Sequence, residues 1–332
     1  MTPPADHIIS LDRFAIGYQK DKELLRNLSL SVNRGEMVAL IGRNGTGKST
    51  LLKSIIGLLE PLHGACLYEG TPFTAYKLPE RARRISYVSS QLTQLPSLRV
   101  RELVALGRMP YSGWMGRLSS EDVTRVKQAL KEVQLSSYAE RPLDYLSDGE
   151  RQRAMIARAL VQDTPVMILD EPTAYLDIPN TYELISLLSR FRDGGKSIIY
   201  STHDVETAMQ CADKMWVIHE NRILEGAPED LGLSGLFYEL FSSSGITYDE
   251  QVGRFLFSAI HKGSISLEGK QKNVLRWTRN TMERLGYRVE EGAGMKIEVR
   301  YASGEKQWIL HRGDRPLPFK NLYSLARFLI QE

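Results

Sequence analysis

The sequence predicts an α/β protein built on a parallel sheet with crossover helices, followed by a small α+β unit at the carboxyl end. Three observations lead to this expectation. A glycine-rich segment at 42–50 lies between the apolar runs 37–41 and 51–56, as in a strand–loop–helix unit. Between residues 166 and 220, strand-like and helix-like runs alternate, which is typical of parallel strands joined by helices. After Pro228 this alternation ends.

The larger expected domain covers residues 1–235. Its start, at 8–36, consists of short β-rich segments around a charged turn, and residues of about 95–160 have mostly helical patterns. Within that helical region, Ser120 precedes two acidic residues and an apolar stripe, so we expect it to cap a helix. The apolar run 166–169 then opens the alternating strands and helices.

The smaller expected domain covers residues 236–332. Helical patterns at 271–286 and 321–332 flank strand-like runs, which predicts an α+β unit of unknown role. No catalytic constellation is visible in it. Its isolated histidines are expected to be structural and its tryptophans to lie in the core; these residues are His261, His311, Trp277 and Trp308.

The segment GRNGTGKST has the spacing of a phosphate-binding loop. Its glycines let successive backbone N–H groups turn inward around phosphates, while the following helix directs its positive end at the same charge. Lys48 is placed to neutralise the β- and γ-phosphates, and the Ser49 hydroxyl to ligate Mg²⁺. The expected nucleotide contacts in this loop are Gly42, Asn44, Gly45, Gly47, Lys48, Ser49 and Thr50.

Two adjacent carboxylates end the apolar run in VMILDEP. Asp170 would hold Mg²⁺ directly or through water, on a strand that we expect to run beside the strand at 37–41. Glu171 is one residue further along, where a carboxylate can polarise the attacking water without joining the first shell of the metal. We therefore assign Glu171 as the general base.

Composition narrows the class of protein. With 332 residues and 42% hydrophobic content, the chain can form a full core and a second unit. Cys66 and Cys211 lack metal-binding spacing, which fits a reduced compartment. No signal peptide or run of 18 apolar residues is visible, so we expect membrane contact only through a partner. Residues 245–332 carry 15 Lys and Arg against 10 Asp and Glu, but these are interleaved, which favours a solvated face over a patch that binds nucleic acid or anionic headgroups.

Taken in order, the phosphate loop, LSDGERQR at 146–153 and the LDEP tetrad resemble the nucleotide-binding subunit of an ATP-binding cassette (ABC) transporter, over about residues 8–230. The resemblance implies a P-loop NTPase fold with an antiparallel β subdomain and a helical subdomain. It also implies roles for single residues. Gln91 matches the glutamine that contacts Mg²⁺ or the water, His203 the switch histidine at the γ-phosphate, Asp177 the D-loop aspartate, and Tyr18 the aromatic residue that stacks on adenine.

The signature LSDGERQR differs from the commonest LSGGQ form at Asp148 and Glu150. Ser147 and Gly149 are kept, and a helix follows, so a hydroxyl, a backbone N–H and a helix N-terminus can still meet a γ-phosphate. Asp148 beside that phosphate would be unfavourable unless its side chain points away, and its orientation is left open. Ser147, Gly149 and Glu150 complete the expected nucleotide contacts.

One phosphate loop and one signature in the chain imply a homodimer, because in this family each signature completes the site on the opposite cassette. The segment 102–122 and the signature region resemble ATPases of bacterial importers for iron–siderophore, haem and cobalamin. The expected partners are two permease subunits and, indirectly, a substrate-binding protein, at the cytoplasmic face of the inner membrane. Two alternatives stay open: another transporter cassette, for export or lipid handling, and a soluble ABC ATPase acting on ribosomes or nucleic acid.

Overall fold

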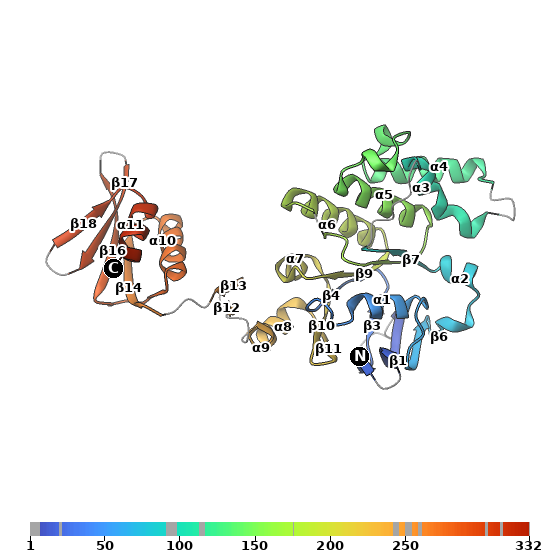
Figure 1. Cartoon of the computed structure of the whole chain (residues 1–332), viewed down its shortest axis with the longest axis horizontal. Coiled ribbons are helices and arrows are strands. Elements are labelled where there is room, and N and C mark those ends of the chain that lie inside the picture. Colours follow the sequence, from blue (N-terminus) through green and yellow to red (C-terminus); the bar gives the residue numbers. More distant parts are fainter. Residues whose placement is uncertain are drawn as a thin grey trace. The chain divides into compact units, whose positions relative to one another are not determined.

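The computed structural model divides into two compact units, Met1–Ser234 and Gly235–Glu332 (Figure 1). The structure describes residues 7–19, 22–90, 98–112, 117–174, 176–241, 246–249, 254–257, 261–302, 305–312 and 315–331. Among these, no helix is both long and apolar enough to cross a membrane.

A six-stranded sheet forms the centre of the first unit. Its strands run in the order β11 (Arg222–Gly226), β10 (Lys214–His219), β4 (Met37–Ile41), β9 (Ser197–Thr202), β8 (Val166–Leu169) and β7 (Ile85–Val88). All neighbouring pairs are parallel except β10 and β11. The expected parallel sheet is present, but the expectation that β8 runs beside β4 is wrong, because β9 lies between them. Both strands are completely buried, so their apolar pattern carries no information about which strand is the neighbour.

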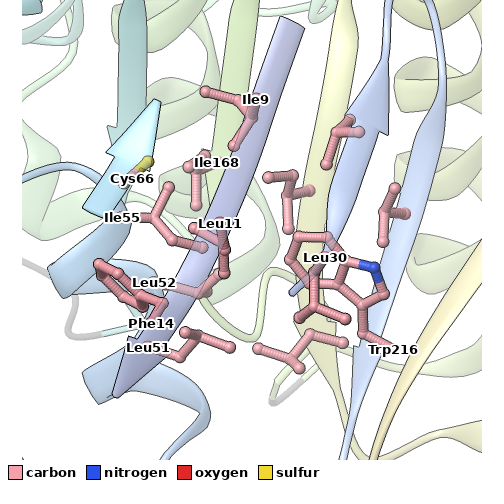
Figure 2. Close-up of a cluster of buried hydrophobic side chains, with 14 of the residues drawn as sticks. Ile9, Leu11, Phe14, Leu30, Leu51, Leu52, Ile55, Cys66, Ile168 and Trp216 are labelled. Atoms are coloured by element: carbon pink, nitrogen blue, oxygen red, sulfur yellow. The ribbon is translucent and has the colours of Figure 1, made fainter. Parts of the chain in front are cut away.

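Helix α1 (Lys48–Ile55) packs between the central sheet and a second, antiparallel sheet. This second sheet consists of β1 (His7–Gln19), β2 (Lys22–Leu28), β3 (Ser31–Asn33), β5 (His63–Tyr68) and β6 (Thr71–Pro72). Figure 2 shows Leu11 and Phe14 of β1 packed with Leu52 and Ile55 of α1. Cys66 lies in the same cluster, where burial raises the pKa of its thiol to about 12. This core fixes α1, and therefore the phosphate loop before it, against both sheets.

The helical part of the unit comprises α3 (Val100–Ala105), α4 (Ser120–Glu132) and α5 (Asp148–Val161), with 3₁₀ turns at Leu106–Tyr111, Ser136–Tyr138 and Leu143–Tyr145. The 3₁₀ turn Phe73–Ala75 and helix α2 (Leu78–Ala82) precede it, and Phe73 packs in the core around α1. Helix α4 is capped by Ser119, whose hydroxyl accepts the Asp122 N–H at 3.1 Å, so the cap lies one residue before the expected Ser120. Ser120 is instead the first helical residue, because the reciprocal bond of the capping box, from Ser119 N–H to Asp122, requires that spacing.

Close packing joins the 3₁₀ turn at 106–111 to α5. A Cβ on Gly107 would lie 2.1 Å from the Arg158 carbonyl oxygen, so only glycine fits there. The buried guanidinium of Arg108 donates to Asp122 Oδ1 at 2.7 Å and to the Val161 carbonyl at 3.0 Å. Gly107 and Arg108 therefore hold α4 and α5 in close contact. Helices α6 (Ile178–Asp193), α7 (Val205–Cys211) and α8 (Pro228–Leu233) complete the first unit.

The second unit begins with α9 (Leu236–Phe241) and the hairpin of β12 (Ile246–Asp249) and β13 (Arg254–Phe257). A five-stranded sheet follows, in the order β15 (Tyr287–Val289), β14 (Gly263–Gly269), β16 (Met295–Ala302), β17 (Glu305–Arg312) and β18 (Arg315–Phe319). Helices α10 (Lys272–Arg284) and α11 (Leu322–Gln331) share one core with it.

Of the two tryptophans of the second unit, Trp308 lies in the core as expected, whereas the expectation for Trp277 is wrong, because 66% of its surface is exposed. The buried stripe of α10 is Val274, Thr278 and Met282, and Trp277 lies off that stripe. The other tested expectation, that His311 has a structural role, fits its contact with Glu298 at 3.1 Å on the neighbouring strand.

Candidate functional site

The phosphate loop connects β4 to α1. Gly47, the residue directly before α1, has φ of 101°, and Gly45 has φ of 81°; both lie in the left-handed region that favours glycine. Helix α1 begins without a side-chain cap and without an acidic residue in its first turn. The start of the helix therefore has no side-chain acceptor of its own, and its positive end suits an anion.

Lys48 is the first residue of α1, and only 5% of its surface is exposed. Its Nζ donates to the Gly42 carbonyl at 2.9 Å and lies 3.3 Å from Glu171 Oε1. The ammonium group is thus held inside the loop, next to the carboxylate that ends the buried strand β8.

In the described part of the chain, four hydroxyl groups donate to the Asp170 carboxylate, which is 1% exposed. Ser49 and Ser201 donate to Oδ1 at 3.0 and 2.7 Å, while Tyr87 and Ser90 donate to Oδ2 at 3.3 and 3.4 Å. Burial, and then the charge of Asp170, raise the pKa of the Tyr87 phenol, so this group stays protonated and donates. Because parallel strands end at the same edge of the sheet, Asp170 and Ser49 meet although β9 separates β8 from β4.

Glu171 has an unusual backbone conformation. Its φ is 47°, in the left-handed region, which costs about 1–2 kcal/mol for a residue with a side chain. The Ser201 hydroxyl accepts the Glu171 N–H at 2.8 Å. One buried hydroxyl on β9 therefore holds both acidic residues, through the side chain of Asp170 and the backbone of Glu171.

The remaining sequence-predicted residues lie at several places in the chain. His203 follows β9 directly and is exposed at the same edge of the sheet. Asp177 is the N-cap of α6, with Oδ1 accepting the Asn180 N–H at 3.0 Å. Asn44 is exposed in the loop and Thr50 is buried in α1. Gln91 lies outside the described residues, and for Tyr18 only the backbone, in β1, is described.

The signature forms the N-terminus of α5. Ser147 caps the helix: its hydroxyl accepts the Glu150 N–H at 3.2 Å, and its own N–H donates to Glu150 Oε2 at 2.8 Å. This second bond is the main cause that lowers the pKa of the Glu150 carboxyl below its usual value. Asp148, whose orientation the sequence left open, is 4.0 Å from Arg151 on the next turn, and 60% of its side chain is exposed. Gly149, between Asp148 and Glu150, is the second residue of α5.

Sequence reasoning missed Ser201, Tyr87 and Ser90. A signal existed for the first: Ser201 is a polar residue inside an apolar strand, two positions before His203. Tyr87 and Ser90 lie near the end of β7, next to β8, and only the strand order reveals that they reach Asp170.

Comparison with known proteins agrees with this geometry. The family model described as ABC transporter matches residues 25–174, and the model described as iron ABC transporter C-terminal domain matches residues 262–330. The chain is 38% identical over 225 residues to the achromobactin transport ATP-binding protein of Dickeya dadantii, covering 67% of this chain and 83% of that protein. It belongs to the ABC transporter ATP-binding family.

Further relatives of this ABC ATPase include the ferric enterobactin transport ATP-binding protein of Escherichia coli, 34% identical over 243 residues, covering 73% of this chain and 89% of that protein. A dimeric structure of a bacterial ABC transporter cassette is 28% identical, with a TM-score of 0.59 over 66% of this chain and 98% of that chain. The family and the fold show that the chain binds and hydrolyses ATP. The second unit, whose role the sequence did not indicate, matches a family of its own.

Proposed function

We propose that this protein is the ATP-hydrolysing subunit of a bacterial importer for an iron chelate of the siderophore type. Two independent parts of the chain support this: the cassette is similar to siderophore-transport ATP-binding proteins, and the second unit matches the iron ABC transporter C-terminal domain. The observation that carries the ATPase role is the cluster of Lys48, Asp170 and Glu171 at one edge of the sheet. Haem and cobalamin stay alternative cargoes.

The chemistry proposed for ATP follows from this cluster. Lys48 and the N–H groups at the start of α1 bind the β- and γ-phosphates. The oxygen atoms of Ser49 and Asp170, 3.0 Å apart, suit a hard cation and would hold Mg²⁺, which neutralises charge that develops on the phosphates. Glu171 takes a proton from the attacking water, with its carboxylate beside Lys48. Gln91 and His203 assist at the metal and the γ-phosphate, and Tyr18 stacks on adenine.

The proposed working unit is a homodimer in which Ser147 and Asp177 of one copy face the nucleotide held by Lys48 of the other. Both residues cap helix N-termini and are exposed. Exposed apolar side chains lie beside each of them: 70% of Tyr145 and 74% of Ile178 face solvent. Such residues next to polar motifs are typical of a surface that another protein covers. The dimeric cassette among similar structures supports the same assembly.

Permease subunits are proposed to dock on the surface made by α2 and the 3₁₀ turn at 106–111. Leu78 is 75% exposed and Met109 is 65% exposed. Arg83 links the two elements, because its guanidinium donates to the Pro110 carbonyl at 2.7 and 3.0 Å. Movement of the helical part on ATP binding would therefore be passed to a partner on this surface. The proposed location is the cytoplasmic face of the inner membrane, with a substrate-binding protein on the other side.

The test is to purify the chain with its partners from native membranes and to reconstitute the complex in lipid vesicles. We expect a multi-span permease to copurify, and ATP hydrolysis to rise when the binding protein carries a ferric siderophore but not the metal-free siderophore. Lys48→Ala should keep the permease and lose turnover. Recovery of ribosomes in place of a permease, or equal stimulation by both forms of the siderophore, would contradict the proposal.

A further inference from the structure

The solvent face of the α10–α11 layer carries large side chains that the ATPase chemistry does not use. Trp277 of α10 is 66% exposed, and Tyr323 and Ile330 of α11 are 71% and 57% exposed. Both helices pack on the same core, so their solvent faces point away from the same sheet. Exposed apolar side chains that form a patch can mark a surface that another molecule covers.

Packing prevents α10 from turning Trp277 inward. Val274, Thr278 and Met282 form the buried stripe, and the Thr278 hydroxyl accepts the indole N–H of Trp308 at 2.8 Å in the core. Rotating the helix would break this bond and expose the stripe. The exposed position of Trp277 is therefore fixed by the fold of the second unit.

The same helix is strongly basic. Four cations stand against one carboxylate, Glu283, and the cations Lys272, Arg276, Arg279 and Arg284 are all exposed. Arg327 adds a further exposed cation on α11. The face therefore combines aromatic rings with positive charge. This combination is complementary to a partner that has negative charge on its surface and an apolar layer below that surface.

A shallow hollow of about 360 Å³ is lined by Lys272, Asn273, Arg276 and Trp277. All four residues come from α10, so protein walls it on one side only. A small ligand there would stay open to solvent on its other sides, whereas pockets that hold small molecules enclose most of their ligand. A broad, flat, anionic body matches this face better.

We propose that the α10–α11 face contacts the anionic phospholipid surface of the membrane at which the cassette works, an inference that rests on the proposed transport function. Trp277 lies at the headgroup level, where indole rings are favoured, and the cations meet lipid phosphates. The contact adds a second attachment of the chain to the membrane, independent of the permease and of ATP.

The experiment is vesicle co-sedimentation of the full chain, without permease or nucleotide. Vesicles of phosphatidylglycerol and phosphatidylcholine in equal parts are compared with phosphatidylcholine alone. We expect binding to the anionic vesicles only, weakened by raising NaCl from 0.1 to 0.5 M. Lys272→Gln/Arg276→Gln should lower partitioning about 30-fold, from about 1 kcal/mol per cation. Trp277→Ala should lower it about tenfold.

Lys127→Gln/Lys131→Gln is the matched control, because both lysines are exposed on α4 of the first unit. It should partition like the unaltered chain. Equal binding to neutral vesicles, or unchanged binding of the α10 variants, would overturn the proposal. Binding of a single-stranded oligonucleotide in place of vesicles would also overturn it and would assign the face to nucleic acid. Trp277 fluorescence that is already shielded from an aqueous quencher without lipid would overturn it as well, and would assign the face to the cassette. Siderophore-stimulated ATP hydrolysis is measured separately, so failure of the transport function gives a different result.

Discussion

Removing the Ser201 hydroxyl tests whether one buried group holds both acidic residues of the ATP site. Ser201 is fully buried, and Ser201→Ala deletes its 2.7 Å bond to Asp170 and its 2.8 Å bond from the Glu171 N–H. Asp170 keeps its other hydroxyl partners, but the Glu171 N–H loses its partner. Two lost bonds, one leaving a donor unsatisfied, amount to about 2–3 kcal/mol of unfolding free energy.

The effect on catalysis is expected to exceed the effect on binding. Without the bond from its N–H, Glu171 can leave its left-handed conformation, which moves the carboxylate away from Lys48. A displacement of about 1 Å at a reacting group can lower a rate about 100-fold. We expect kcat for ATP to fall about 10- to 100-fold, with KM changed less than about threefold because the phosphate loop is untouched.

Ser197 provides a matched control on the same strand. It is also fully buried, accepts the Gly35 N–H at 3.0 Å and donates to the Asn33 carbonyl at 3.1 Å, at the end of β9 far from His203. Ser197→Ala should cost a similar unfolding free energy and leave kcat unchanged. Steady-state ATP hydrolysis and urea unfolding of both variants decide the question. Equal kcat values for the two variants would refute the reasoning.

Three further predictions concern the same unit. Glu171→Gln should bind ATP normally but hydrolyse it about 10²- to 10⁴-fold more slowly, as measured by ATP binding and single-turnover hydrolysis; full turnover would exclude Glu171 as the base. Gly107→Ala should destabilise the fold by several kcal/mol, because its Cβ would lie 2.1 Å from the Arg158 carbonyl oxygen, and a melting temperature within 1–2 °C of the unaltered chain would contradict this packing. The pKa of Glu150 is lowered by the Ser147 N–H, so its contribution to stability is present above about pH 4.5 and is lost as pH falls through its folded pKa. The stability difference between the unaltered chain and Glu150→Gln should therefore shrink on acidification, and a difference that grows below pH 4 would show the opposite linkage.

Local sequence determined the parts of this protein that depend on neighbours along the chain. The phosphate loop, the capping pair Ser147 and Glu150, and the acids after the strand at 166–169 each follow from residue types at fixed short spacing. Glycine at 45 and 47 supplies the left-handed backbone, and a helix start without a cap supplies free N–H groups, wherever the rest of the chain lies.

Tertiary structure decided which residues meet. The sequence placed the strand of Asp170 beside that of the phosphate loop, but β9 intervenes, and this is why Ser201 of β9 reaches both Asp170 and Glu171. It placed Trp277 in the core, whereas the packing of Val274 and its stripe turns the indole outward. Completely buried strands look alike in their apolar pattern, and a helix with several apolar residues can present more than one face. Strand order and helix rotation are therefore fixed by long-range packing, which no short window of sequence contains.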